Sequence, residues 1–189
     1  MERQAHAPGI RGAGSALQAR HYDIFVDGST EHRVAIGAAA VASTGNSCRV
    51  RRCGFFVGPG ASELLGVMLG YRVYQFLLND LEQDQRDSCS ATLHIDSAHC
   101  IKYMDGLTPS KAAGRKLMPL IDMVREEQRR HPQVTWTKCT SAEKLAHSLA
   151  YSAMCEARDH GVEDGPDEIV RALFAAVCEV ETLTRRVHP

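Results

Sequence analysis

The sequence predicts an α/β fold in which a mixed five-stranded sheet carries helices on both faces. Three observations lead to this prediction. Three strand-like segments follow one another with short connections, which is typical of an antiparallel meander. Two further strand-like segments each follow a helix-like segment, and such a crossover places a strand parallel to its neighbour. Putting the fourth strand beside the first gives the order 3-2-1-4-5, with strands 1 to 3 antiparallel.

Length and composition favour one globular domain. The 189 residues suffice for a domain of about 150 residues with tails. We expect a flexible tail at 1–20, the domain at 21–158, and an extension at 159–189 with a helix that packs on the domain. No apolar run approaches the roughly 20 residues that a membrane span needs, so no membrane partner is expected.

Cysteine usage favours an intracellular protein. The seven cysteines are scattered, odd in number and never spaced as CxxC, which indicates free thiols in a reducing compartment. We therefore expect the cytoplasm or the nucleus. The Ala-, Gly- and Arg-rich tail partly shares the composition of a mitochondrial transit peptide, which leaves that compartment as an alternative.

The first predicted strand is the alternating segment 22–30. Asp23, Phe25 and Asp27 fall on one of its faces, and Tyr22 and its alternate neighbours fall on the other. We expect this strand to end at Asp27 and to turn through the following glycine. Segments 34–43 and 48–58 predict the second and third strands.

A helix, a strand and a second helix are predicted next. Segment 61–82 is too densely apolar for a strand and predicts a buried helix, with Glu63 in its first turn. The polar segment that follows predicts a loop. Segment 90–96 predicts a strand that ends at Asp96, and either Asp96 or Ser97 would cap the short helix after it.

The last part of the chain predicts three helices and one strand. An amphipathic helix begins near Arg115 and ends before Pro132. A fifth strand follows, with Val134 and Trp136 on the same face and Trp136 largely buried. The helix at 141–157 would turn Leu145, Leu149 and Ala153 inward, and a terminal amphipathic helix would cover 168–186.

The predicted topology brings carboxylates together. Asp27 and Asp96 end neighbouring parallel strands, and Glu63 begins the helix that packs over them. Taken singly, the three could be a turn residue, an N-cap and a first-turn acid. Two carboxylates about 4 Å apart repel by about 4 kcal/mol at an effective dielectric of 20, so together they favour a bound cation. Oxygen ligands alone select Mg²⁺ or Mn²⁺, and carboxylate-held Mg²⁺ usually serves a phosphate.

In their order and spelling these segments resemble the type 1 ribonuclease H family over 22–157. The shared motifs are a strand ending in DGS, a small-residue strand with Gly37, SELLG, IDS, VTWTK and A-x-S-L-A. The resemblance implies an endonuclease that hydrolyses the RNA strand of RNA/DNA hybrids with two Mg²⁺ or Mn²⁺ ions. It implies that Asp27 bridges both ions, that Glu63 and Asp96 complete one site, and that His147 joins Asp27 at the other.

The sequence departs from the family pattern at three places. His147 stands where the family usually has Asp, the loop before its helix lacks the usual Gly-His, and the basic extra helix of some members is missing. Glycine and serine positions remain candidates for substrate contact. Gly28 and Ser29 would approach a ribose 2′-hydroxyl, while Ser62 and Ser97 would face the substrate backbone.

The expected partner is an RNA/DNA hybrid, within a larger nucleoprotein or a reverse-transcription machinery. With a net charge of -1, a polyanion would have to be held by local basic patches. Two alternatives share the predicted fold: a binding scaffold without turnover, and a nuclease for DNA junctions or double-stranded RNA. The three candidate patches contain Arg49, Arg51 and Arg52, then Lys111, Arg115 and Lys116, and finally Arg125, Arg129 and Arg130.

Overall fold

The structure is a computed structural model that describes residues 19–31, 34–53, 60–79, 81–110, 115–140 and 144–161. It contains one five-stranded sheet in the order β3-β2-β1-β4-β5, in which β1 to β3 are antiparallel and β4 is parallel to both of its neighbours. The predicted fold class and strand order are therefore confirmed. The elements are β1 (His21–Glu31), β2 (Ala35–Ala42), β3 (Ser47–Cys53), α1 (Ala61–Asn79), α2 (Gln83–Asp87), β4 (Ser90–Ile95), α3 (Ala98–Met104), α5 (Met118–Arg130), β5 (Val134–Lys138) and α6 (Lys144–His160).

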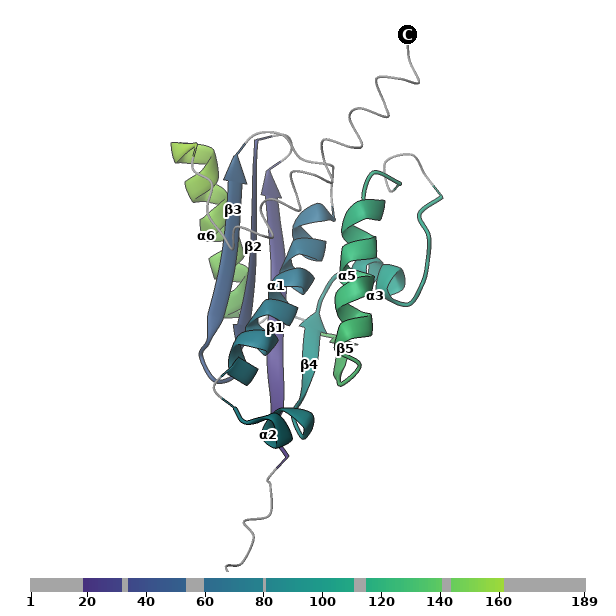
Figure 1. The fold of residues 1–189 in the computed structure, drawn as a ribbon. Coiled ribbons are helices and arrows are strands. Elements are labelled where there is room, and N and C mark those ends of the chain that lie inside the picture. The colour runs from purple at the N-terminus through teal and green to yellow at the C-terminus, as the bar shows by residue number, and fades with distance from the viewer. Residues whose placement is uncertain are drawn as a thin grey trace, which may run out of the picture.

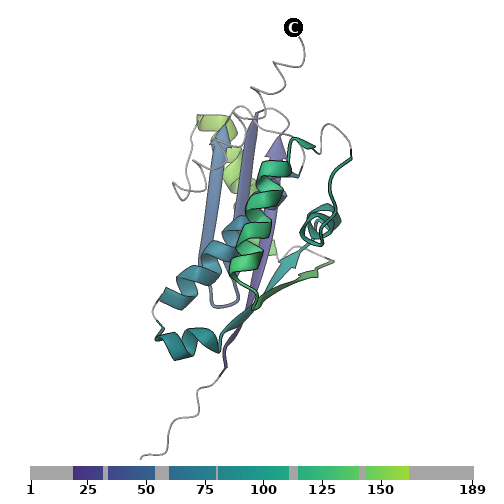
Figure 2. The ribbon, with the colours of Figure 1, turned by 45° about the vertical axis from the view of Figure 1, so that its right-hand side comes forward.

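Helices cover both faces of the sheet. Helices α1 and α5 lie on one face and α6 lies on the other, as Figures 1 and 2 show. The main core lies between the sheet and α1 with α5, where alternate β1 side chains such as Ile24 and Val26 are buried. Tyr71 and Tyr74 of α1 and Leu120 of α5 fill the same layer.

Helix α6 packs closely on the other face because β2 is built from small residues. A Cβ atom added to Gly37 would lie 2.2 Å from the carbonyl oxygen of Ala150. Small side chains fit best against a sheet at that distance, and Ala146, Ala150 and Ala157 are buried; Met154 is buried beside Ala35. The prediction of which α6 side chains face inward was therefore wrong in part. Ala153 is buried as predicted, but Leu145 is 52% exposed.

Strand β1 does not end at Asp27 as predicted. It continues to Glu31, and Gly28 pairs with Ala38 of β2. Beyond Val26 the strand loses β4 on one side but keeps β2 on the other, so pairing with β2 sustains it. Gly28 is therefore a strand glycine and makes no turn at this point.

Some boundaries differ from the sequence-based expectation. The polar segment after α1 was expected to be a loop, but it forms the short helix α2, which a capping box at Glu82 stabilises. Helix α5 begins at Met118, with Pro119 in its first turn, rather than near Arg115. Residues 54–58 of the expected third strand, the expected tail at 1–18 and the expected helix at 168–186 lie outside the described residues. Among the described helices, none combines the length and apolar character required to cross a bilayer.

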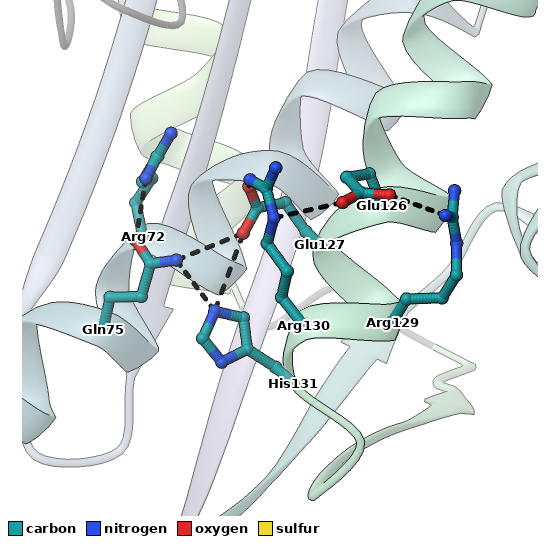
Figure 3. Close-up of polar contacts among 7 residues, drawn as sticks. All are labelled: Arg72, Gln75, Glu126, Glu127, Arg129, Arg130 and His131. Carbon is teal, nitrogen blue, oxygen red and sulfur yellow. Dashed lines mark hydrogen bonds and ion pairs between the residues drawn. The ribbon is translucent and has the colours of Figure 1, made fainter.

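A buried polar network joins α1 to α5 and is drawn in Figure 3. Gln75 of α1 donates from its amide nitrogen to Glu127, 3.1 Å away, and lies 2.8 Å from Nε2 of His131. Glu127 is only 4% exposed, and Arg130 donates to its other oxygen at 3.0 Å. Burial lowers the pKa of His131, which keeps the ring neutral between the helices. These bonds fix α1, and with it the carboxylate in the first turn of α1, relative to α5.

Trp136 is less buried than predicted. It shares a face of β5 with Val134, as expected, but its side chain is only partly covered. Its indole N–H donates to Asp105 Oδ1 at 3.2 Å, at the end of α3. Val134, by contrast, is 2% exposed. The indole is held at the rim of the core because its polar edge finds a partner there.

Candidate metal centre

The carboxylates of Asp27 and Asp96 meet at one edge of the sheet. Strands β1 and β4 run parallel, and Val26 and Ile95 form their last aligned pair. Asp27 and Asp96 each follow directly after that pair. The two side chains are therefore neighbours because the strand ends are aligned, as the topology predicted.

Two glycines allow α1 to bring Glu63 to the same edge. A Cβ atom on Gly28 would lie 2.4 Å from the backbone nitrogen of Glu63. A Cβ atom on Gly66 of the helix would lie 2.7 Å from the carbonyl oxygen of Asp27. One glycine on the strand and one on the helix thus allow direct contact between the two backbones. Glu63 then lies in the first turn of α1, directly over β1.

The three carboxylates form a tight group. One oxygen of each of Asp27, Glu63 and Asp96 lies within 4.8 Å of the others. Asp27 is 3% exposed, and burial raises its pKa; Asp96 raises it further, while the hydrogen bond from His147 opposes the change. Burial, with the charges of Asp96 and Asp27, raises the pKa of Glu63 to about 8. Without a cation, the group therefore retains a proton at neutral pH.

The arrangement suits a hard divalent cation. Oδ1 of Asp96 is buried without a hydrogen-bond partner in the described part of the chain. A buried, unpaired carboxylate oxygen is costly, and a metal ion would satisfy it. All the donors in the group are carboxylate oxygens, which Mg²⁺ and Mn²⁺ prefer. The residues present thus fit a divalent ion, and the same ion would offset their mutual repulsion.

His147 lies beside the carboxylate group as a hydrogen-bond partner of one member. Its Nδ1 is 2.9 Å from Oδ2 of Asp27, and its side chain is 62% exposed. The group within 4.8 Å contains the three carboxylates and does not contain this ring. Helix α6 therefore brings His147 to Asp27, where it orients the carboxylate in this conformation.

The four residues predicted to contact substrate lie close to the carboxylates in the chain, and they differ in solvent exposure. Gly28 and Ser29 lie partly exposed on β1. Ser62 is only 2% exposed and offers a substrate almost no surface in this conformation. Ser97 is the N-cap of α3, and its hydroxyl oxygen accepts a hydrogen bond of 3.4 Å from the backbone of Cys100.

Two cysteines, Cys100 and Cys139, lie near the centre. Burial raises the pKa of Cys100 to about 12, and the charges of Glu63 and Asp96 act in the same direction. Cys139 donates its backbone N–H to Ile95 at 3.0 Å; burial and then Asp96 raise the pKa of its thiol. The sequence indicates that Cys139 lies near the centre, because this residue directly follows the fifth strand, at the sheet edge that carries the carboxylates.

In two of the three basic patches, arginines form ion pairs with neighbouring acids. Arg49 and Arg51 of β3 both pair with Glu156 of α6. Arg129 pairs with Glu126 at 2.7 Å, and Arg130 pairs with Glu126 at 3.2 Å. Lys111, from the remaining patch, lies outside the described residues. A polyanion would therefore compete with these ion pairs for the arginines.

Solved structures share this fold at low sequence identity. Over 72% of the chain, the protein matches 99% of the RNase H1 from the halophilic archaeon Halobacterium salinarum NRC-1, with a TM-score of 0.53 and 16% identity. It also matches 98% of LC11-RNase H1, solved in complex with an RNA/DNA hybrid, over 72% of this chain, with a TM-score of 0.56 and 15% identity. The chain therefore has a ribonuclease H-like fold. No family model matches the sequence, and no curated protein matches it.

Proposed function

We propose that this protein is an endonuclease that hydrolyses the RNA strand of RNA/DNA hybrids with two divalent metal ions. The observation that carries the proposal is the carboxylate group of Asp27, Glu63 and Asp96, gathered within 4.8 Å at one sheet edge. A scaffold would gain nothing from a buried, mutually repulsive acidic group. The ribonuclease H-like fold supports the same activity by analogy.

The carboxylates would hold the ions. Asp27 would bridge them, Glu63 and Asp96 would complete one site, and His147 would join Asp27 at the other. When bound, two Mg²⁺ or Mn²⁺ ions supply the activation of water and the stabilisation of the leaving oxygen. Nδ1 of His147 is 2.9 Å from Oδ2 of Asp27, so an ion held between these two atoms would replace their hydrogen bond.

Other residues of the chain would prepare the centre for its substrate. The hydrogen bond from His147 orients Asp27 before the substrate arrives. Glu63 must lose its proton before it can act as a ligand, because its raised pKa keeps it protonated in the empty centre. The partly exposed backbone of Gly28 and Ser29 would approach the ribose 2′-hydroxyl, the group that distinguishes RNA from DNA. Ser97 would contact the substrate backbone.

The test is a cleavage assay with a labelled RNA strand presented in a hybrid, in an RNA duplex and as a single strand, with Mg²⁺ or Mn²⁺. We expect cleavage of the hybrid alone, and loss of at least 100-fold in rate for Glu63→Gln, as is typical when a transition-state contact is lost. Asp23→Asn is the matched control, because Asp23 lies on the same strand and bonds to His94 outside the carboxylate group. Equal cleavage of the RNA duplex, or of a labelled DNA duplex assayed in parallel, would favour the RNA or junction nuclease, and no cleavage in either metal would favour the scaffold.

A further inference from the structure

A cavity of about 770 Å³ lies on the α5 side of the sheet, between α3, α5 and the edge strand β5. Its volume is in the range of pockets that bind small molecules, about 300 to 1,000 Å³. Its lining includes Asp105 and Gly106 after α3, Arg125 and Arg129 of α5, and Trp136 of β5. None of the three carboxylates of the candidate metal centre lines it.

The cavity is separated from the metal centre by the length of α3. Asp96 directly precedes this helix, and the cavity begins at Met104 and Asp105, at its other end. Gly106 lines the cavity in the left-handed region, with a φ of 102°, and a Cβ atom added to it would meet nothing within 4 Å. Trp136 does not fill the cavity, because its indole N–H donates a hydrogen bond to Asp105 at the edge of the cavity. The cavity is therefore distinct from the metal centre.

An aromatic surface forms one side of the cavity. Trp136 is only partly covered, although it packs against the edge of the main core. Met104 and Val134 lie beside it in the lining and are 4% and 2% exposed. A flat aromatic ring can stack on an indole held in this way, and stacking of a nucleobase on an aromatic side chain contributes about 1 to 3 kcal/mol.

Two guanidinium groups line the same cavity, and that of Arg125 also lies 3.9 Å from the carboxylate of Asp122. Arg125 is held in place, because its Nε and Nη2 donate to the carbonyl of Tyr103 at 3.0 and 2.8 Å. Arg129 is the more exposed of the two: its side chain is 71% exposed, against 22% for Arg125, and it pairs through Nη1 with Glu126. A guanidinium has five N–H donors, so this pair leaves donors for a second anion. Asp105 is the acid of the lining, and its Oδ1 already accepts the indole N–H.

We propose that this cavity binds a nucleoside monophosphate, with its base stacked on Trp136 and its phosphate bound by Arg129. Both features of the ligand are needed: an aromatic face alone would take any apolar ring, and the arginines alone would take any anion. The amide of Gln128 and the hydroxyl of Thr135 also line the cavity and can bond to the polar edge of a base. The proposal does not depend on the proposed nuclease activity.

The single tryptophan of the chain makes the test direct, because all tryptophan fluorescence comes from Trp136. Adenosine 5′-monophosphate is titrated into the full chain in EDTA, so that no metal is bound and no cleavage occurs. We expect saturable quenching with a Kd between about 0.1 and 1 mM, as one stacked ring with one or two charge-assisted contacts would give. Adenosine should bind more weakly, and inorganic phosphate should cause no quenching.

Two variants on α5 distinguish binding at this cavity from a general effect of positive charge on the protein surface. Arg129→Gln should raise the Kd about fivefold, because it removes a charge-assisted hydrogen bond at a partly exposed site. Arg130→Gln is the matched control, because Arg130 is also exposed and paired with Glu126 but does not line the cavity. The Kd of this variant for the monophosphate should equal that of the wild type. Melting curves of both variants confirm that each is folded. A 5′-phosphorylated tetranucleotide is tested as well. If it binds as tightly as the monophosphate, the cavity binds the 5′-terminal nucleotide of a strand rather than only a free nucleotide.

Two results would overturn the proposal. The first is the absence of saturable quenching by the monophosphate at millimolar concentrations. The second is an equal effect of Arg129→Gln and Arg130→Gln, which would show that the ligand responds only to overall charge. Because the titration contains EDTA and measures no cleavage, its failure would leave the nuclease proposal untouched, and loss of cleavage would leave this site untouched.

Discussion

At the scale of single residues, Glu63 shows how its surroundings alter a carboxylate. Its pKa rises from 4.5 to about 8, first because of burial and then because of Asp96 and Asp27. In the unfolded chain the same group ionises near its ordinary value. Between these two pH values the folded protein binds a proton that the unfolded chain does not, so rising pH destabilises the metal-free fold.

We therefore predict that Glu63→Gln stabilises the metal-free protein more at about pH 8 than at about pH 5. The amide cannot ionise, so the variant avoids the loss of stability that the wild type suffers over this range. The difference should be on the order of 2 kcal/mol, or about 5 °C in Tm for a chain of this length. Thermal melts in EDTA at several pH values measure it. Parallel pH profiles for the two proteins would contradict the raised pKa.

His147 gives a second prediction at this scale, on metal preference. An imidazole offers nitrogen where Mg²⁺ prefers oxygen, whereas Mn²⁺ accepts nitrogen more readily. We expect higher hybrid cleavage in Mn²⁺ than in Mg²⁺, and His147→Asp should raise the Mg²⁺ rate about tenfold or more, within the range that metal-site substitutions produce. Initial rates in each metal measure this.

The matched variant for this position is His147→Ala. It removes the hydrogen bond of 2.9 Å to Asp27, so activity should fall in both metals. Cleavage by His147→Ala at the wild-type rate would show that this exposed ring is a surface residue, and the centre would then consist of the three carboxylates alone.

At the scale of elements, the distance between α1 and β1 decides whether the centre forms. Gly66→Ala places a Cβ atom 2.7 Å from a backbone oxygen of Asp27, so the helix must move away from the strand. We predict a loss of stability of about 2 kcal/mol or more, in the range for overpacked cores, together with weaker metal binding. Chemical denaturation and metal titration measure the two effects.

Gly70→Ala is the control on the same helix. Its Cβ would also be crowded, but by side-chain atoms of the core rather than by backbone, at 2.9 Å from Val26 and 3.0 Å from Leu93. Both substitutions carry the same gain in helix propensity, about 1 kcal/mol, so the comparison isolates the backbone contact. If the two variants lose equal stability and bind metal equally well, the close approach at Gly66 does not position Glu63.

The elements also show what sequence patterns can and cannot predict. The strand order followed from the crossovers, because chain connectivity limits how strands can pair. The inner face of α6 was partly misplaced because hydrophobicity favoured Leu145, while the close approach at Gly37 favours small residues such as Ala150. The end of β1 was misplaced because a glycine after an aspartate predicts a turn, whereas Gly28 serves a contact with a helix distant in sequence.

At the scale of the whole molecule, the group of Asp27, Glu63 and Asp96 could be predicted because topology alone brings strand ends and a helix start together. The partial exposure of Trp136 could not, because it depends on how tightly β5 packs against the end of α3. Packing distances of that kind arise from many side chains at once and leave no local pattern in the sequence.

The last prediction concerns the stability of the whole fold. A ligand that binds only the folded state stabilises it by RT ln(1 + [L]/Kd), about 1.4 kcal/mol at a tenfold excess over Kd. The carboxylate group has no reason to persist in the unfolded chain, so Mg²⁺ or Mn²⁺ should raise the Tm of the wild type by about 3 to 6 °C. Asp27→Asn should melt higher without metal, because one repulsive charge is gone, and should respond little to metal.

Asp23→Asn serves as the control for this experiment. Asp23 lies on the same strand and the same face but bonds to His94 at 2.8 Å, outside the carboxylate group, so its variant should keep the full metal response. Differential scanning calorimetry with increasing metal measures all three proteins. Equal shifts in the wild type and Asp27→Asn would mean that divalent ions act on the surface in general, and Asp27 could then not be the bridging ligand.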